Sequence, residues 1–213
     1  MKEIYIVGED DVTKAVIRRL IQDYAPALSI KGELPARGGQ LKSLIKNFNI
    51  LSADIPVVLL EDLDTEDCAP LARKKLIGTD SQEEDFLINI AVDEAEAWLY
   101  ADVSNLATYL KVPQAAIPQA KPLKMGGPHA RLEVDTDQKT SRHLTKELIL
   151  KSTDPELKQR IHSTDDQCKG KEYNPALLPF IEKYWNPEVA RQSSYSLHTT
   201  IERIKRLNNK YSK

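Results

Sequence analysis

Residues 4–11, IYIVGEDD, join a short apolar run to three consecutive acids, and this stretch decides the predicted fold. The run is continuous and rich in β-branched residues, as in a strand that is buried on both faces. Asp10 and Asp11 stand where the N-cap and the first turn of a helix favour acids. Apolar residues then recur at helical spacing from residue 12 to residue 24. The stretch therefore predicts a buried strand that leads directly into an amphipathic helix.

The alternation of strand and helix continues to about residue 110. Short apolar runs predict further strands, and amphipathic stripes between them predict helices. Strands that alternate with helices are typical of a parallel sheet. We therefore expect an α/β fold with a mostly parallel sheet flanked by helices. The predicted strands are residues 27–31, 55–60 and 86–92, and the predicted helices are 41–48, 68–77 and 95–110, the last with a break near 102–104.

The second half of the chain has a different character. Residues 111–140 contain four prolines and a Gly-Gly pair, which predicts a long irregular connection. Beyond it, the pattern predicts helices near 141–150, 154–162, 174–184 and 195–209. We therefore expect an α/β domain over residues 1–110, a connection over 111–140 and a helical C-terminal extension over 141–213.

The charge is divided unevenly along the chain. The formal net charge of the 213 residues is −2, but residues 1–110 carry −9 and residues 111–213 carry +7. No apolar run approaches the roughly 18 residues that span a bilayer, and the acidic start does not resemble a signal peptide. Two cysteines cannot form a zinc cluster or a disulfide framework. These features predict a soluble cytoplasmic protein with no membrane partner.

Acidic residues follow each of the clearest predicted strands. Ligands of open α/β sheets bind at the carboxyl ends of the strands, so these acids are expected to meet. Residues 62 and 64 are two positions apart, so in extended backbone their carboxylates point the same way. Oxygen ligands with no His or Cys nearby suit Mg²⁺ or Mn²⁺. The predicted metal ligands are Glu9, Asp10, Asp62, Asp64, Glu94 and Glu96.

A simpler interpretation exists for some of these acids. An acid that follows a strand is often a helix cap, and this role is favoured for Asp10 and Asp11. Glu9, Asp62 and Asp64 are harder to explain as caps. For Glu94 and Glu96 the two interpretations stay open.

The layout resembles the topoisomerase–primase (Toprim) domain, in which an apolar strand ends in Glu and a later one ends in Asp-x-Asp. The matching stretches are Ile4–Glu9 and Val57–Asp64. The chain is also similar to small bacterial Toprim-like proteins with a Glu-x-Glu-Ala-Trp-Leu segment, here residues 94–99, followed by Asp102. These proteins end with Tyr-Asn, a Trp and a Ser-rich helix start, as at residues 173–174, 185 and 193–197.

The resemblance implies a Toprim-like fold over residues 1–105 and a metal-dependent nuclease. Related nucleases of the overcoming-lysogenization-defect type cut DNA or RNA with Mg²⁺ or Mn²⁺, and often pair with an ABC-type ATPase in defence against phage. The implied catalytic residues are Glu9, Asp62, Asp64 and Glu94. Toprim motifs usually have Gly directly after the first Glu, whereas here Gly8 precedes it, so Glu9 and Asp10 remain alternative ligands.

Two other functions compete with the nuclease. A response-regulator receiver domain would use the acids after the first strand as its pocket and Asp62 or Asp64 as phosphoacceptor, with Lys121-Pro122 as its Lys-Pro pair. However, no apolar strand precedes that Lys, and Asp93 stands where a receiver has Ser or Thr. The other competitor is a non-catalytic regulatory or adaptor subunit that keeps a degenerate Toprim fold.

Basic residues of the 111–140 connection form a candidate nucleic-acid site. Lys121, Lys124 and Arg131 are interspersed with prolines and glycines, which favours a loop close to the acidic site. We expect this loop to steer a phosphate backbone toward the metal. The simpler interpretation is that these residues are only solvated.

Overall fold

The computed structural model describes residues 1–36, 40–63, 66, 68–119, 133–136, 138–165 and 169–212. Its sheet has the strand order β2-β1-β3-β4, and every pairing is parallel. The predicted α/β fold with a parallel sheet flanked by helices is therefore confirmed. The strands are β1 (Lys2–Gly8), β2 (Leu28–Glu33), β3 (Val57–Asp62) and β4 (Phe86–Ala91).

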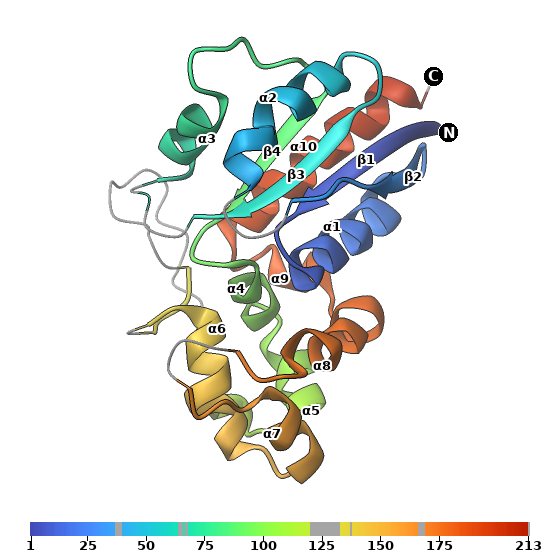
Figure 1. Cartoon of the computed structure of the whole chain (residues 1–213). Coiled ribbons are helices and arrows are strands. Elements are labelled where there is room, and N and C mark those ends of the chain that lie inside the picture. Colours follow the sequence, from blue (N-terminus) through green and yellow to red (C-terminus); the bar gives the residue numbers. More distant parts are fainter. Residues whose placement is uncertain are drawn as a thin grey trace.

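Helices cover both faces of this sheet (Figure 1). Helices α1 (Asp11–Tyr24) and α10 (Tyr195–Tyr211) lie on one face, and α2 (Leu41–Ser52) and α3 (Ala69–Ile77) lie on the other. Alternate side chains of a strand point to opposite faces. Ile4 and Ile6 accordingly belong to the apolar cluster of α1 and α10, while Val7 belongs to that of α2 and α3. Burial on both faces explains why the strands read as continuous apolar runs.

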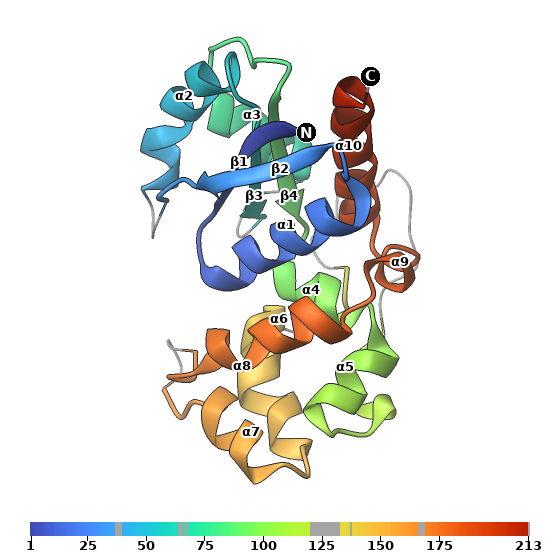
Figure 2. The same cartoon turned by 90° about the vertical axis from the view of Figure 1, so that its right-hand side faces the viewer.

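The remaining helices form a second half beside the carboxyl ends of the strands (Figure 2). The apolar cluster under α1 and α10 continues into this half without interruption. The elements are α4 (Ala95–Tyr100), α5 (Val103–Leu110), η1 (Gln114–Ala116), α6 (Thr140–His143), η2 (Leu144–Leu148), η3 (Ile149–Lys151), α7 (Pro155–Ile161), α8 (Tyr173–Pro179), η4 (Phe180–Tyr184) and α9 (Pro187–Ala190).

Two tryptophans connect the halves. Trp98 is fully buried, and its indole N–H donates to Ser196 Oγ at 2.7 Å, which ties α4 to the start of α10. The indole N–H of Trp185 donates to the Trp98 carbonyl at 3.2 Å. Buried indoles with satisfied N–H groups stabilise a unique packing. Trp98 is therefore a core residue that joins the two halves.

The predicted break in the fourth helix is also present. Asp102 separates α4 from α5, and its carboxylate accepts hydrogen bonds from the Asn105 side chain at 2.9 Å and the Asn186 N–H at 2.7 Å. Helix α9 was not predicted, although Asn186 caps it and Pro187 opens it. Its length of four residues is too short to show periodicity. No helix in the described part of the chain is both long and apolar enough to cross a membrane.

Candidate functional site

The carboxyl ends of β1, β3 and β4 meet at one edge of the sheet and open into a cavity of about 670 Å³. Acids that follow the strands line its sheet side, among them Asp10, Asp62 and Glu94. The opposite wall is the segment that leads into α8, including Lys169 and Tyr173. The sequence prediction that acids converge here is matched by this geometry for the residues that the structure describes.

Asp62, the last residue of β3, is half-buried at this edge of the sheet. Its Oδ1 accepts a hydrogen bond from the backbone N–H of Ala95, the first residue of α4, at 2.9 Å. Burial and the negative charges of Glu96 and Glu94 raise the pKa of Asp62 well above its ordinary value. The surroundings of Asp62 therefore contain too little positive charge to stabilise its ionised carboxylate.

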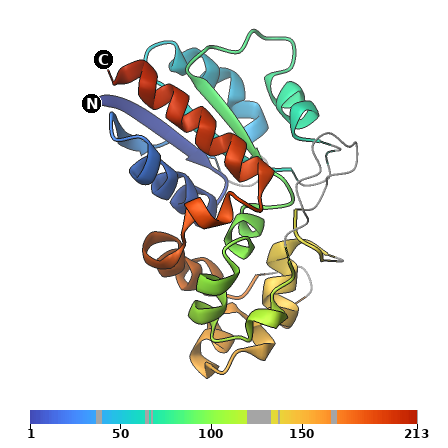
Figure 3. The same cartoon turned by 180° about the vertical axis from the view of Figure 1, so that it is seen from behind.

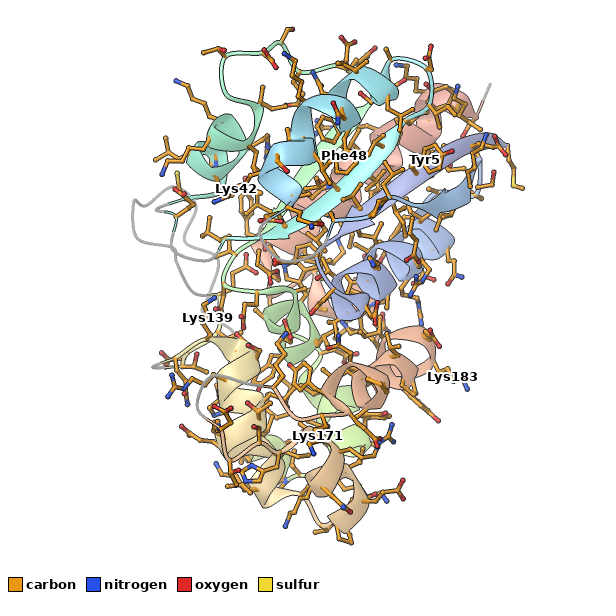
Figure 4. All side chains as sticks on the ribbon, viewed as in Figure 1. Tyr5, Lys42, Phe48, Lys139, Lys171 and Lys183 are labelled. Carbon is orange, nitrogen blue, oxygen red and sulfur yellow. The ribbon has the colours of Figure 1, made fainter. Side chains whose placement is uncertain are left out.

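Two residues of the helical half contact the Glu94 carboxylate. Its Oε2 accepts the Ser141 N–H at 2.8 Å, and its Oε1 lies 3.7 Å from Lys139 Nζ. Lys139 lies at the junction of the two halves (Figure 4). Burial and Glu96 nevertheless raise the pKa of Glu94. Ser141 orients the carboxylate without removing the repulsion.

Asp93 occupies the turn between β4 and α4. Its φ of 69° places it in the left-handed region, which short polar residues tolerate better than most. Its carboxylate accepts a hydrogen bond from the Thr140 hydroxyl. Burial raises the pKa of Asp93 to about 7, although the bonds from Thr140 act in the opposite direction.

Glu96 pairs with Lys169, a lysine from the segment that leads into α8. Lys169 Nζ lies 2.8 Å from Glu96 Oε1 and 3.5 Å from Asp10 Oδ2, and the Tyr173 hydroxyl donates to the same Glu96 oxygen at 2.8 Å. The ammonium also lies 4.8 Å from the centre of the Tyr173 ring, a cation–π distance. Burial lowers the pKa of Lys169, but Glu96 and Asp10 outweigh it and raise that pKa. Lys169 therefore stays charged and neutralises part of the cluster.

Gly170 explains how Lys169 reaches this position. A Cβ at residue 170 would lie 2.3 Å from the Ile161 carbonyl oxygen and 2.7 Å from that of Arg160, closer than real atoms approach. Only glycine lets the chain pass so near the end of α7. The Tyr173 N–H then donates to the Gly170 carbonyl at 3.0 Å and starts α8.

Asp10 and Glu9 have different roles in the structure. Asp10 is the N-cap of α1, as its simpler interpretation predicted: Oδ1 accepts the Thr13 N–H at 2.8 Å. Its other oxygen faces Lys169. Glu9 lines the cavity but is exposed. Of these two alternatives, only Asp10 touches the cluster.

The donor set fits a hard divalent cation in its chemistry, because it consists of carboxylates with unfavourable mutual charge. Within the described ranges, no three Asp, Glu, His or Cys side chains are grouped closely enough to hold a metal ion as they stand. Asp64, a predicted ligand, lies outside the described residues. Of the predicted ligands, Glu9, Asp10, Asp62 and Glu94 line the cavity.

Some predicted site residues lie outside the described part of the chain, and one site residue was not predicted. Lys121, Lys124 and Arg131, the predicted nucleic-acid contacts, lie outside the described residues. No local pattern pairs Lys169 with Glu96, which is 73 residues away in the chain. Its one local signal is the adjacent Gly170, whose necessity appears only in three dimensions.

The chain was also compared with known proteins. No protein-family model matches it, and no significantly similar protein was found among curated proteins or solved structures.

Proposed function

We propose that the protein is a metal-dependent phosphodiesterase that cleaves nucleic acid at the cavity formed by the strand ends. One observation carries the proposal: Asp62 shares its surroundings with Glu94, Glu96 and Asp10, and its pKa is raised by burial and by these charges. Such a cluster gains stability from a bound cation. Perturbed carboxylates in a cavity are also typical of functional sites.

The residues that line the cavity would have separate roles in the reaction. Asp62, Glu94 and Asp10 would hold Mg²⁺ or Mn²⁺, with Glu9 and Asp64 as the further ligands that the resemblance implies. Bound there, such an ion would activate water and neutralise the scissile phosphate. The N–H groups of Ala95 and Ser141 orient two of the carboxylates. Lys169 brings a positive charge to the same cavity, where it would attract a phosphate oxygen.

The test is cleavage of single-stranded DNA, duplex DNA and RNA in Mn²⁺ or Mg²⁺, with and without EDTA. We expect Asp62→Asn to abolish cleavage, because the neutral amide binds a hard cation poorly. Asp80→Asn is the matched control, because Asp80 is an exposed acid in the loop before β4. Full cleavage by Asp62→Asn would contradict the proposal.

Metal binding gives a second readout that needs no substrate. Mn²⁺ should raise the melting temperature of the wild-type protein by mass action. The same shift should be absent from Asp62→Asn and retained by Asp80→Asn. Equal shifts in all three proteins would show that the ion binds elsewhere.

One observation favours a second function, a non-catalytic regulatory subunit. Lys169 already supplies a positive charge to Glu96 and Asp10, as in a site that has lost its metal. In that case neither Mn²⁺ nor Mg²⁺ would stabilise the protein or support cleavage.

The resemblance to Toprim nucleases supplies the finer parts of the proposal. They are action on DNA or RNA in the cytoplasm, a role in bacterial defence against phage and an ABC-type ATPase partner. Copurification of such an ATPase with the tagged protein would support the last of these.

A further inference from the structure

Three arginines come from the two helices that pack against β4, the strand at the outer edge of the sheet. We name Arg73, Arg203 and Arg206 the arginine cluster. Arg73 belongs to α3 and the other two to α10, and these helices pack on opposite faces of β4 (Figure 3). The cluster therefore depends on the tertiary structure.

The guanidinium groups are close enough to disturb one another. Burial, together with the positive charges of Arg73 and Arg206, lowers the pKa of Arg203 to about 10. Burial also lowers the pKa of Arg73. Like charges that share a partly buried site are unfavourable unless an anion joins them.

No carboxylate in the described part of the chain forms an ion pair with any of the three. Glu202, one turn before Arg206, is engaged by Arg191 and Lys205 instead. Arg203 donates one hydrogen bond, from Nη1 to the Ile88 carbonyl at 3.1 Å. The Nε–H of Arg73 is buried and has no hydrogen-bond partner among the described atoms.

The same helix also carries an exposed aromatic ring. Tyr195, the first residue of α10, is 52% exposed and lies about two turns before Arg203. Exposed aromatic rings next to arginines are the usual surface on which proteins hold single-stranded nucleic acid: the rings stack on bases and the guanidiniums bind phosphates. Guanidinium also matches phosphate with two parallel hydrogen bonds.

We propose that the arginine cluster and Tyr195 bind the backbone and a base of a single-stranded nucleic acid, as a second site beside the acidic cavity. The choice of nucleic acid as the anion rests on the proposed function. Ile88, which Arg203 contacts, lies three residues before the end of β4 at Ala91, about 10 Å at 3.3 Å per residue. The carboxyl end of β4 opens into the acidic cavity, so one single-stranded nucleic acid can reach both sites.

If Arg203 has a purely structural role, a different result is expected for the other residues of the cluster. Arg203 covers the backbone of an edge strand, and charged side chains often protect such edges from pairing with other chains. That role needs Arg203 alone. Arg73, Arg206 and Tyr195 would then be dispensable for any binding.

The experiment measures binding of fluorescein-labelled single-stranded DNA and RNA by anisotropy, in EDTA and at several salt concentrations. We expect Arg73→Gln/Arg206→Gln to lower affinity on the order of tenfold and to reduce the slope of log K against log salt by about 1.4, because each phosphate contact on a single strand contributes about 0.7. Arg203 stays in place, so β4 remains covered.

The matched control is Lys158→Gln/Lys183→Gln, which removes two positive charges from the helical half. Lys183 lies far from α3 (Figure 4). We expect its salt slope to equal that of the wild type. Equal losses in the two double variants, unchanged binding in the arginine variant, or no binding by the wild type would each overturn the proposal.

Tyr195→Ala separates base stacking from charge. It should weaken DNA and RNA binding but leave competition by inorganic polyphosphate unchanged, because polyphosphate has no bases. Weakened polyphosphate competition in this variant would contradict the stacking role. The binding assay contains EDTA and therefore does not depend on the metal site, so a failure of cleavage does not remove the arginine-cluster result.

Discussion

Like charges gather in the acidic cluster at the carboxyl ends of the strands, which consists of Asp10, Asp62, Glu94 and Glu96, and in the arginine cluster at the β4 edge. Among the described residues, only the acidic cluster contains a countercharge. Lys169 comes from the segment before α8 and contacts Glu96 and Asp10. Among the described residues, no acid does the same for Arg73 or Arg203. Without a bound ligand, the acidic cluster therefore lowers the stability of the folded protein only moderately.

The contrast between the two clusters distinguishes two kinds of site for an external ion. A partly neutralised cluster is able to exchange its internal cation for another, whereas an unpaired cluster of the opposite sign calls for an anion from solution. Four variants test the two clusters on one scale, the free energy of unfolding in urea without divalent ions.

The largest expected effect is a change in how the free energy of unfolding depends on pH, and it arises from Asp93. A folded-state pKa of about 7 exceeds the ordinary value for Asp of about 4, so the folded protein binds this proton more tightly than the unfolded chain. The stability from this proton is complete below about pH 4 and is lost as the pH rises through 7. From pH 5 to pH 8 the wild type should lose about 3 kcal/mol relative to Asp93→Asn. Parallel stability curves would show that Asp93 is ionised throughout.

Lys169→Met should produce the second-largest change in the free energy of unfolding. It leaves the buried Glu96, 2% exposed, beside Asp62 and Glu94 without its cation. We expect a loss of about 2 kcal/mol, below the 3–5 kcal/mol of fully buried pairs because the Lys169 side chain is 38% exposed. Mn²⁺ should restore stability more strongly in this variant than in the wild type. Lys171→Met, an exposed lysine on the same cavity, is the control and should change neither quantity.

Asp62→Asn should stabilise the metal-free protein by about 1 kcal/mol at neutral pH, because it removes a charge that burial, Glu96 and Glu94 disfavour. The amide oxygen can still accept the Ala95 N–H. A gain in stability together with a loss of Mn²⁺ binding is the expected pair of results. A destabilised variant would mean that the carboxylate itself holds the turn.

Arg73→Met should give the smallest effect, a gain of about 0.5 kcal/mol, because it removes a buried N–H without a described partner and a charge close to Arg203. Arg160→Met is the control: Arg160 is also partly buried, but it pairs with Glu172 at 2.8 Å. The control should lose stability instead. A loss at Arg73 as well would show that its stem contributes more by packing than its charge removes.

Much of the α/β half could be predicted because its signals are local. The apolar run of β1, the cap at Asp10 and the stop at Gly78, with a φ of 69°, each depend on neighbouring residues. The helical half was harder, since η2 and η4 continue from α6 and α8 as wider turns, and Pro179 lies inside a continuous helical segment. Packing against the shared core overrides local preference there.

The gathering of acids at one edge of the sheet follows from the amino-acid sequence, because parallel strands bring their carboxyl ends to one edge whatever the details of packing. Which charges meet these acids depends on the tertiary structure. Glu96 and Lys169 are 73 residues apart, and the passage of Gly170 against the Ile161 carbonyl brings them together. Arg73 and Arg203 likewise meet only because α3 and α10 pack on the same edge strand. Such contacts depend on the path of the whole chain, and no local pattern encodes them.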